Sequence, residues 1–330
     1  MTSSPAPASP PAPSWAGVRV MVTGGHGFLG RHLVAALRAR GATTILAPTS
    51  AELDLRDAAA TRAYVVAARP DRLFHLAARV GGIGANRARP ATFFHDNMAM
   101  GLSVLAAAHA AGVAQTVLLG TTCSYPRDAP LPLVEDDLWA GYPEPTNAPY
   151  GVAKRALVTL ADAYRAEHGL RSITLLPANL YGPGDHFDPE LSHVVPAMVQ
   201  RLCEAVDARA RTVTCWGDGS ATRELLHVAD CARAIVLAAE RYDEAAPLNL
   251  GSGVELTMRE LAARVAEASG YDGALAWDPT RPAGQPRRCL DSRRSRALLG
   301  DYATTPLADG LAATVADYRA RRAAGRGALA

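Results

Sequence analysis

Short apolar runs alternate with amphipathic segments through the first half of the chain. The apolar runs are candidate strands, at residues 18–23, 43–47, 72–77, 116–121 and 172–176. Between them, apolar residues recur every three or four positions, which is typical of helices. These candidate helices lie at residues 29–40, 57–68, 97–111 and 150–168. Because strands joined by crossover helices pair in parallel, the pattern predicts an α/β fold with a Rossmann-like, doubly wound parallel sheet.

The pattern becomes irregular after about residue 178. We expect a helix from Ser192, short strands at 213–216 and 248–250, and helices at 228–241 and 258–269. The helix at 228–241 and the strand at 248–250 suit the first sheet, so the two lobes are expected to be interleaved. The predicted dinucleotide-binding domain comprises residues 17–178 and about 225–250, and the smaller C-terminal substrate lobe comprises residues 179–224 and 251–330.

The N-terminal residues 1–16 are rich in Pro, Ala and Ser and lack the basic start and apolar run of a signal peptide. We expect them to form a disordered tail. No stretch approaches the roughly 18 uninterrupted apolar residues that a membrane-spanning helix needs. A cytoplasmic protein with no membrane partner is therefore expected.

Composition narrows the choice of partners and cofactors. The 34 basic and 32 acidic side chains give a formal net charge of +2, with no long run of like charge. Nucleic acid is therefore not expected as a partner. The five cysteines are scattered and contain no Cys-x-x-Cys pair, so we expect neither disulfides nor a metal site.

A glycine-rich loop follows the first candidate strand. Gly24, Gly27 and Gly30 form a Gly-x-x-Gly-x-x-Gly pattern that opens the next candidate helix. Glycine permits a tight turn there and lets a diphosphate approach the free N–H groups of the helix. We expect a dinucleotide at this loop, with Phe28 and Leu29 among its contacts. The spacing resembles that of the extended short-chain dehydrogenase/reductase family, which implies an NAD(P)-dependent enzyme.

The resemblance implies further cofactor residues. Leu76, Ala77 and Ala78 would lie under the adenine and ribose, and Asn97 on the following helix would belong to the same site. Tight packing of helix against strand explains Ala77 equally well. Both interpretations of Ala77 stay open at this point.

The choice between NAD and NADP depends on the residues after the second strand. An acid there binds the ribose 2′-hydroxyl of NAD, and an arginine binds the 2′-phosphate of NADP. The chain has Pro48, Thr49 and Ser50 at this point, so neither charge is present. The hydroxyl groups of Thr49 and Ser50 suit either cofactor.

Tyr150 and Lys154 are four residues apart at the start of a candidate helix, so their side chains lie on one face. A nearby cation lowers the pKa of a phenol from about 10, which lets tyrosine transfer a proton at neutral pH. Among 34 basic residues Lys154 is the only lysine, which leaves 33 arginines, and a surface pair would have used arginine. We expect a catalytic pair, with Lys154 also bonding the nicotinamide ribose and Thr121 holding the substrate oxygen.

Five motifs narrow the resemblance. They are Val-Gly-Gly-Ile (80–83), Thr-Thr-Cys-Ser-Tyr-Pro (121–126), Glu-Pro-Thr-Asn-Ala-Pro-Tyr (144–150), Asn-Leu-Tyr-Gly-Pro (179–183) and Ser-His-Val-Val-Pro-Ala (192–197). Together they resemble the GDP-L-fucose synthase family over about residues 18–300. The resemblance implies an enzyme that inverts C3 and C5 of GDP-4-keto-6-deoxy-mannose and reduces its C4 ketone with NADPH.

The same resemblance implies roles for Cys123 and His193. A 4-keto group acidifies the protons at C3 and C5, so inversion needs a base on one face of the ring and an acid on the other. The ordinary pKa values, about 8.5 for a thiol and about 6.5 for imidazole, permit proton transfer near neutral pH. As alternatives, Cys123 is a buried thiol at a strand end, and His193 caps the helix that begins near Ser192.

The resemblance also implies a GDP site and an assembly. It assigns Asn179, Arg201, Trp216 and Arg223 to the substrate. Guanidinium forks suit a diphosphate, and a flat indole suits a base or a sugar. Members of the family commonly dimerise through two helices of the large domain, so we expect a homodimer.

Three departures from the family pattern leave alternatives open. Thr121 stands where serine is usual, Gly151 stands where alanine is usual, and the arginines for a 2′-phosphate are absent. The missing arginines favour an enzyme that needs no 2′-phosphate site. A redox-neutral GDP-mannose-type 3,5- or 5-epimerase with tightly bound NAD(H) is such an enzyme, in contrast to a reductase that uses NADP(H). A heptose substrate is equally open. A non-catalytic nucleotide-binding protein is the third alternative, although it would not need Tyr150, Lys154 and Cys123 together.

Overall fold

The computed structural model describes residues 15–188, 192–281 and 285–325. Residues 1–14 of the expected tail lie outside the described residues. Trp15 does not belong to a tail, because its side chain is buried, packs on Phe74 at 6.1 Å between ring centroids, and donates its indole N–H to Glu240 at 2.7 Å. This corrects the expected boundary at residue 16. A large aromatic ring gains more by burial than a loose tail would lose in freedom.

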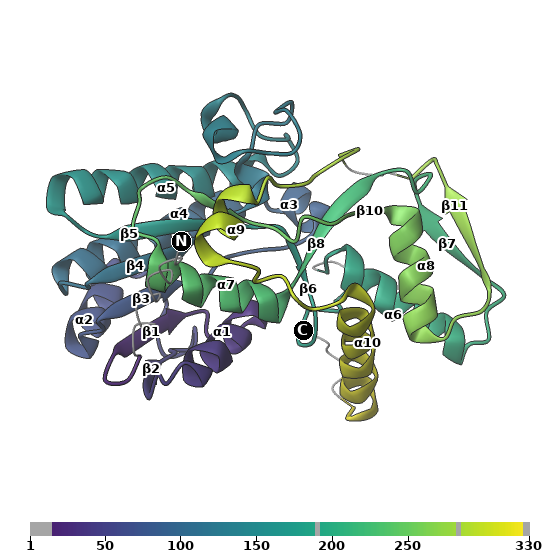
Figure 1. Cartoon of the computed structure of the whole chain (residues 1–330), viewed down its shortest axis with the longest axis horizontal. Helices are drawn as coiled ribbons and strands as arrows, with labels where there is room; N and C mark the ends of the chain where they lie inside the picture. The colour runs from purple at the N-terminus through teal and green to yellow at the C-terminus, as the bar shows by residue number, and fades with distance from the viewer. Residues whose placement is uncertain (1–14, 189–191, 282–284, 326–330) are drawn as a thin grey trace, which may run out of the picture.

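The centre of the large domain is a six-stranded parallel sheet in the order β2-β1-β3-β4-β5-β9 (Figure 1). Its strands are β1 (Arg19–Thr23), β2 (Thr44–Leu46), β3 (Arg72–His75), β4 (Gln115–Leu119), β5 (Ser172–Pro177) and β9 (Leu248–Leu250). From β1 the chain first adds β2 on one side of it. It then crosses to the other side of β1 and adds β3, β4, β5 and β9 in turn. The predicted Rossmann-like, doubly wound sheet is therefore confirmed.

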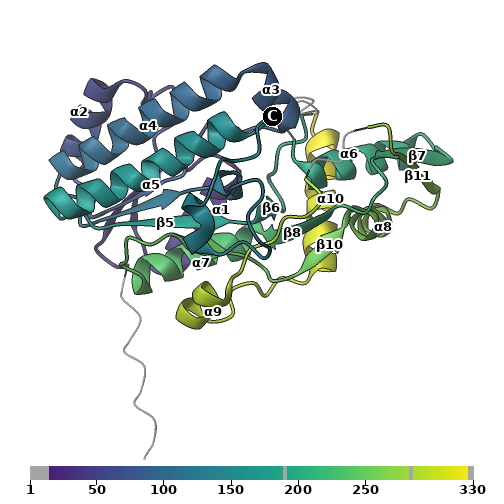
Figure 2. The same ribbon diagram turned by 90° about the horizontal axis from the view of Figure 1, so that it is seen from above.

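Helices cover both faces of this sheet. One layer contains α2 (Ala58–Ala68), α4 (Pro90–Ala110) and α5 (Ala148–His168), and the other contains α1 (Phe28–Ala39) and α7 (Val228–Arg241) (Figure 2). Helix α4 begins seven residues before the expected start at residue 97, because Pro90 suits the first turn of a helix. The short helix α3 (Ile83–Ala88) precedes it and was not expected.

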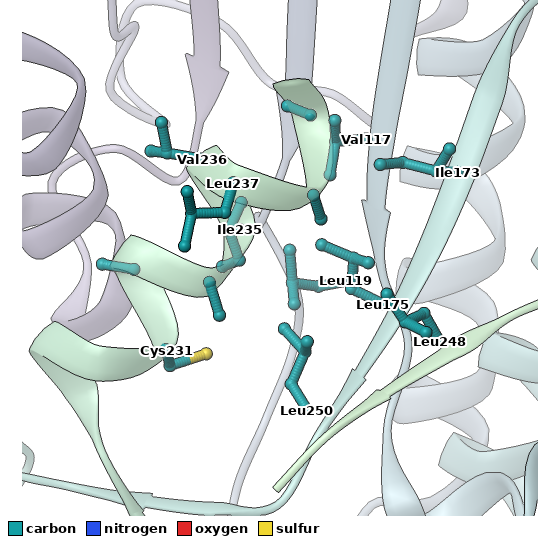
Figure 3. Close-up of a cluster of buried hydrophobic side chains, with 14 of the residues drawn as sticks. Val117, Leu119, Ile173, Leu175, Cys231, Ile235, Val236, Leu237, Leu248 and Leu250 are labelled. Carbon is teal, nitrogen blue, oxygen red and sulfur yellow. The ribbon is translucent and has the colours of Figure 1, made fainter. Parts of the chain in front are cut away.

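The core lies where α7 meets the sheet (Figure 3). Strand β4 is buried at all five positions, as expected for a parallel strand covered by helices on both faces. Cys231 on α7 is buried in this cluster beside Ile235, so it acts as a small apolar side chain. This packing keeps the carboxyl ends of the strands in fixed positions, and the candidate site lies at those ends.

The smaller lobe has its own core and two small sheets. Its strands are β6 (Asn179–Tyr181), β7 (Thr212–Trp216), β8 (Thr222–His227), β10 (Glu255–Thr257) and β11 (Ala274–Asp278). Its helices are α6 (Val194–Asp207), α8 (Met258–Ser269) and α10 (Leu307–Ala323), seen at the right of Figure 1.

Two connections bring later residues back to the large domain. Strand β9 pairs with β5, and α7 packs against α1. The short helix α9 (Arg293–Leu299) contacts α7 and β9, so this part of the expected substrate lobe lies against the large domain. Elsewhere the expected division into lobes stays a prediction.

Candidate functional site

The loop between β1 and α1 is closely packed and requires glycine. Gly24 has φ +73°, and a Cβ atom there would lie 2.7 Å from the backbone nitrogen of Ala77. A Cβ on Gly30 would collide with the carbonyl oxygen of Gly24. The glycines therefore allow the backbone of this loop to approach the backbone of Ala77 closely. The contact explains the glycine at position 24, and both interpretations of the Ala77 side chain stay open.

The N-terminus of α1 fits a diphosphate. Gly27 is the residue before the helix, and no side chain caps the N–H groups of the first turn. Uncapped N–H groups at the positive end of a helix dipole bind anions. Phe28 and Leu29 form the first turn and are half-buried, with Leu29 packed on the core. These residues fit the dinucleotide expected from the sequence.

An acid lies near the point where the adenosine ribose is expected. The backbone N–H and the hydroxyl of Thr49 donate to Glu52 at 2.8 and 2.9 Å. These bonds hold the pKa of Glu52 below its usual value, so the carboxylate is ionised at neutral pH. His26 in the glycine loop bonds the carbonyl oxygen of Ala47 at 2.8 Å. Its electrostatic interaction with Glu52 makes a small further contribution to lowering the pKa of that carboxyl group. Sequence reasoning stopped at Ser50, which is exposed, and missed Glu52 two residues later.

The side chain of Asn97 holds the turn after β3. Its amide oxygen accepts from the N–H of Arg79 at 3.1 Å, and its amide nitrogen donates to the carbonyl oxygens of Arg79 and Phe93 at 3.0 and 2.6 Å. The side chain is buried and both amide hydrogens are used. We infer that Asn97 positions the turn containing Ala78, while Leu76 continues the ladder with an N–H bond to Thr23 at 3.1 Å.

Glu144 positions the start of α5. One carboxylate oxygen accepts from the N–H groups of Thr146 and Asn147 at 3.1 and 3.2 Å. The turn that precedes the helix is thereby fixed, and with it the direction of the first two helical turns. Tyr150 and Lys154 lie on those two turns, so Glu144 is a positioning residue that sequence reasoning did not single out.

Lys154 is buried one helical turn after Tyr150 on α5. Its ammonium donates to the carbonyl oxygen of Leu119 at 2.9 Å, at the end of β4. Burial lowers the pKa of Lys154 to about 8, so the side chain can still be charged at neutral pH. No carboxylate pairs with it among the described residues. Nearby His75 bonds the Thr23 hydroxyl at 2.8 Å, and burial, with a smaller effect of Lys154, lowers its pKa to about 3.

The pKa of Tyr150 differs from the expectation. Burial is the main cause that raises it, nearby Cys123 raises it further, and a hydrogen bond with Thr121 acts in the opposite direction. The expected lowering by Lys154 is not found in this state of the protein. The reason is geometric, because the ammonium bonds the backbone of Leu119 and the phenol lies in a desolvated position.

Burial of Lys154 predicts a pH effect on stability. Because its folded pKa lies below the value of 10.5 for a free side chain, the unfolded chain binds more protons between pH 8 and 10.5, and stability rises with pH there. The Lys154→Met side chain cannot titrate, so this pH dependence is absent from the variant. We expect the free energy of unfolding of the wild type to rise relative to that of Lys154→Met by roughly 1–3 kcal/mol between pH 7.5 and 10. Urea unfolding of both ligand-free proteins at the two pH values measures this. An unchanged difference would contradict the buried ammonium.

Thr121, Cys123 and Tyr150 are brought together at the carboxyl end of β4. The Thr121 hydroxyl accepts from the N–H of Cys123 at 3.2 Å and also bonds Tyr150. Cys123 packs beside Tyr150 and is half-buried, whereas the other four cysteines are buried. This answers the alternative of a buried strand-end thiol, since Cys123 is the cysteine that solvent reaches.

Arg288 is a site residue that sequence reasoning missed. Its guanidinium Nη1 donates to the Cys123 sulfur at 3.5 Å from a segment 165 positions later in the chain. One arginine among 33 gives no signal by itself. Only the fold shows that this one reaches the thiol.

Gly151 is explained by the same arrangement. A Cβ at this position would collide with the carbonyl oxygen of Cys123, and the Gly151 carbonyl oxygen accepts from the Ser124 hydroxyl at 3.0 Å. The departure from alanine therefore allows α5 to approach the short helix η1 (Thr122–Ser124) closely.

Gly151→Ala is expected to force these elements apart. The overpacking should lower the free energy of unfolding by about 1–3 kcal/mol and displace Cys123. Chemical denaturation measures the stability. Gly84→Ala is the matched control, because a Cβ at Gly84 meets nothing within 4 Å. Equal midpoints for Gly151→Ala and the wild type would contradict the close contact.

His193 lies directly before α6, in the smaller lobe. His193 is the N-cap residue of α6, as the alternative interpretation places it, but its side chain makes no capping hydrogen bond. The residue is exposed, and desolvation by the surrounding protein, with a smaller effect of His186, lowers its pKa. Among the described residues it makes no contact with Cys123 or Tyr150. Its role as the second proton carrier stays a prediction.

The expected GDP residues are spread over the smaller lobe. Asn179 on β6 and Arg223 on β8 lie on paired strands, and Asn179 donates to the Glu224 carbonyl oxygen at 3.4 Å. Arg223 is half-buried, and desolvation together with Arg288 lowers its pKa to about 10. These contacts bring Arg223 close to the guanidinium that reaches Cys123.

The other two expected GDP residues lie around β7. Arg201 on α6 donates to the Thr214 carbonyl oxygen at 3.0 Å. Trp216 is 55% exposed at the end of β7, and the guanidinium of Arg281 lies 5.6 Å from its ring centroid. An exposed indole with a cation over it can receive a flat base. Nothing in the described residues fixes how these two relate to the Tyr150 site.

In the described part of the chain, no cluster of three or more His, Cys, Asp or Glu side chains could hold a metal ion. None of its helices is both long and apolar enough to pass through a membrane.

A glycine loop at an uncapped helix, a buried Tyr-Lys pair and a neighbouring thiol define an extended short-chain dehydrogenase/reductase. Residues 20–251 match the NAD dependent epimerase/dehydratase family, and the chain belongs to that family.

Named relatives are similar over nearly the whole chain. GDP-L-fucose synthase 1 of Arabidopsis thaliana is 42% identical over 296 residues, which cover 90% of this chain and 91% of the relative. GDP-L-fucose synthase of Escherichia coli K12 is 38% identical over 305 residues, covering 90% and 95%. A solved GDP-L-fucose synthetase of Naegleria fowleri bound to NADP has a TM-score of 0.85 and 25% identity, covering 93% of this chain and 96% of that chain.

Proposed function

We propose that this protein is a GDP-sugar 3,5-epimerase/4-reductase acting on GDP-4-keto-6-deoxy-mannose or a close 4-keto relative. The observation that carries the proposal is the mutual contact of Thr121, Cys123 and Tyr150, with Lys154 one helical turn further along α5. A reductase alone needs the tyrosine and the lysine. A partly exposed thiol beside them supplies a second proton-transfer group, which inversion requires. The names of the relatives support the same substrate class.

The residues divide the reaction into two parts. The C4 ketone lets the C3 and C5 protons leave as an enolate forms, and Cys123 and His193 exchange those protons on opposite faces of the ring. Thr121 then holds the C4 oxygen, and Tyr150 gives it a proton as the alcohol forms. A nicotinamide cofactor, when bound, would supply the hydride to C4. Lys154 would hold the ribose of that cofactor.

The cofactor is NADP(H) in this proposal, because a solved relative carries NADP. Glu52 is the observation that favours NAD(H) instead, since an ionised acid repels a 2′-phosphate and suits a 2′-hydroxyl. Initial rates with NADPH and NADH at equal concentrations decide between them. A higher kcat/KM for NADH would overturn the NADP(H) assignment.

Deuterium exchange tests the reaction itself. The protein is given GDP-4-keto-6-deoxy-mannose with NADPH or NADH in D₂O, and separately GDP-mannose with NAD, and the products are analysed by mass and NMR. Oxidation of the cofactor with deuterium at C3 and C5 supports the proposal. A deuterated epimer of GDP-mannose without net cofactor use would show the redox-neutral alternative instead. A heptose 4-keto substrate in the first arm tests the space around C6.

We also propose a homodimer formed through α4 and α5. Near the start of both helices lies an apolar groove of about 460 Å³, lined by Pro90, Ala91, Phe94, Tyr142, Pro149 and Val152. Phe94 and Leu102 on α4 are 40% and 46% exposed. Apolar side chains gathered on one surface mark an interaction site. Sedimentation equilibrium should give twice the chain mass, and a monomer at micromolar concentration would contradict the proposal.

A further inference from the structure

Arg288 approaches Cys123 from a segment that is fixed on both sides. The carbonyl oxygen of Arg288 accepts from the N–H of Glu224 on β8 at 3.2 Å. The next residue, Cys289, accepts from the N–H of Leu133 at 2.9 Å, in the large domain. The backbone at Arg288 is thus held between a strand of the smaller lobe and a segment of the large domain.

The guanidinium is held as well. Its Nε donates to the side-chain oxygen of Gln285 at 2.9 Å, and Nη2 bonds the same oxygen. Nη1 is left to point at the Cys123 sulfur at 3.5 Å. One amide therefore fixes the plane of the guanidinium, and the remaining N–H group is directed at the thiol.

The charge of Arg288 has no acidic partner among the described residues. Its neighbour Arg287 pairs with Glu255 at 2.8 Å, which shows that acids are within reach of this segment. Arg288 instead lies beside a second cation, Arg223, whose pKa it helps to lower. The groups that face Cys123 are Tyr150 on α5 and Arg288, while Arg223 interacts with both Arg288 and Glu255. The cation that contacts the sulfur is therefore Arg288, and a guanidinium N–H directed at a sulfur stabilises a negative charge that forms there.

We propose that Arg288 is a positioning residue for Cys123, which holds the sulfur beside Thr121 and stabilises the thiolate that accepts a proton from the sugar ring. In that step the thiolate takes a proton from C3 or C5 and becomes a thiol, and the negative charge passes to the enolate. His193 then gives a different proton to the opposite face of the enolate, which restores the keto sugar with inverted configuration. Afterwards the Cys123 thiol gives its proton to water, so that the thiolate forms again beside Arg288, and His193 takes a proton from water.

This inference rests on the proposed epimerase function, but part of its test does not. Cys123 is the one described cysteine that is not buried, so iodoacetamide should alkylate it selectively. The alkylation rate is measured from pH 6 to 10 for the wild type, Arg288→Gln and Arg288→Lys, with Cys123→Ser as the blank. We expect alkylation of Arg288→Gln at pH 7 to be about tenfold slower, with its pH midpoint moved upward, and Arg288→Lys to lie between.

Arg127→Gln is the matched control. Arg127 lines the same small cavity of about 30 Å³ as Arg288, but it is paired with Asp128 at 2.9 Å and does not contact Cys123. Cys123 in Arg127→Gln should be alkylated at the same rate as Cys123 in the wild type. Thermal unfolding of each variant confirms that it is folded. A wild-type pH profile in Arg288→Gln, or the same shift in Arg127→Gln, would overturn the proposal.

The second readout is catalytic. With the 4-keto substrate in D₂O, Arg288→Gln should lower the kcat for deuterium incorporation at C3 and C5 by about tenfold. Arg288→Lys should restore part of it. A rise in KM with unchanged kcat would show that Arg288 binds substrate rather than acting through Cys123. If the wild type alkylates as expected but turns over no 4-keto sugar, the epimerase function fails while the contact between Arg288 and Cys123 stands.

Discussion

Replacing Tyr150 with phenylalanine is expected to lower the rate of ketone reduction by about 10²–10⁴-fold. The ring keeps its edge contact with Phe93, whose centroid lies 6.5 Å away, so the pocket should hold its shape. What is lost is the hydroxyl that bonds Thr121 and gives the C4 oxygen its proton. Stopped-flow absorbance of cofactor oxidation measures the hydride step directly.

Nucleotide binding separates a catalytic effect from damage to the fold. GDP and cofactor affinities of Tyr150→Phe, measured by calorimetry, should stay within about threefold of the wild type, because the phenol contributes one bond at most. Tyr64→Phe on α2 is a suitable control, since Tyr64 packs in a distant part of the core. Reduction by Tyr150→Phe at the wild-type rate would show that another group protonates the oxygen.

Burial explains why the environment of Tyr150 could not be predicted from spacing. The four-residue interval placed the phenol and the ammonium on one helix face, and both do lie on the first turns of α5. The interval says nothing about the backbone that the ammonium bonds. The carbonyl oxygen of Leu119 comes from β4, and only the packing of α5 on the sheet brings it to 2.9 Å from Lys154.

The features that the sequence predicted correctly are local in the chain. The glycine loop lies directly between the strand Arg19–Thr23 and the helix Phe28–Ala39, and short-range patterns encode the geometry of all three. The sheet follows because alternating strands and helices have few arrangements. The resemblance of residues 121–126 to a family motif then predicted Thr121 and Cys123 as site residues.

The features that were missed depend on long-range contacts. Arg288 reaches Cys123 across 165 positions, and Trp15 bonds Glu240 across 225. An arginine has no periodic signature, and a tryptophan in a Pro-rich segment looks like part of a tail. Glu52 was missed for another reason, because its hydrogen bonds to Thr49 form a compact turn after β2 that places the acid later than expected.

Replacing Cys123 with serine should separate inversion from reduction. A serine hydroxyl keeps the size of the side chain and its place beside Thr121, but its much weaker acidity removes it as a proton carrier near neutral pH. We expect deuterium incorporation at C3 and C5 to fall by about 100-fold or more. Tyr150, Lys154 and the cofactor loop are untouched, so reduction of the uninverted ketone should continue.

The product then records which step failed. Cys123→Ser should oxidise the cofactor while forming a 4-hydroxy sugar that keeps the C3 and C5 configuration of its substrate, visible in proton couplings by NMR. Cys203→Ser is the control, because Cys203 is buried on α6 and belongs to the core of the smaller lobe. Full deuteration of the product by Cys123→Ser would show that a group other than Cys123 removes the C3 and C5 protons. Loss of both activities would mean that the thiol is needed to hold Tyr150 in place, since the two side chains pack together beside Phe93.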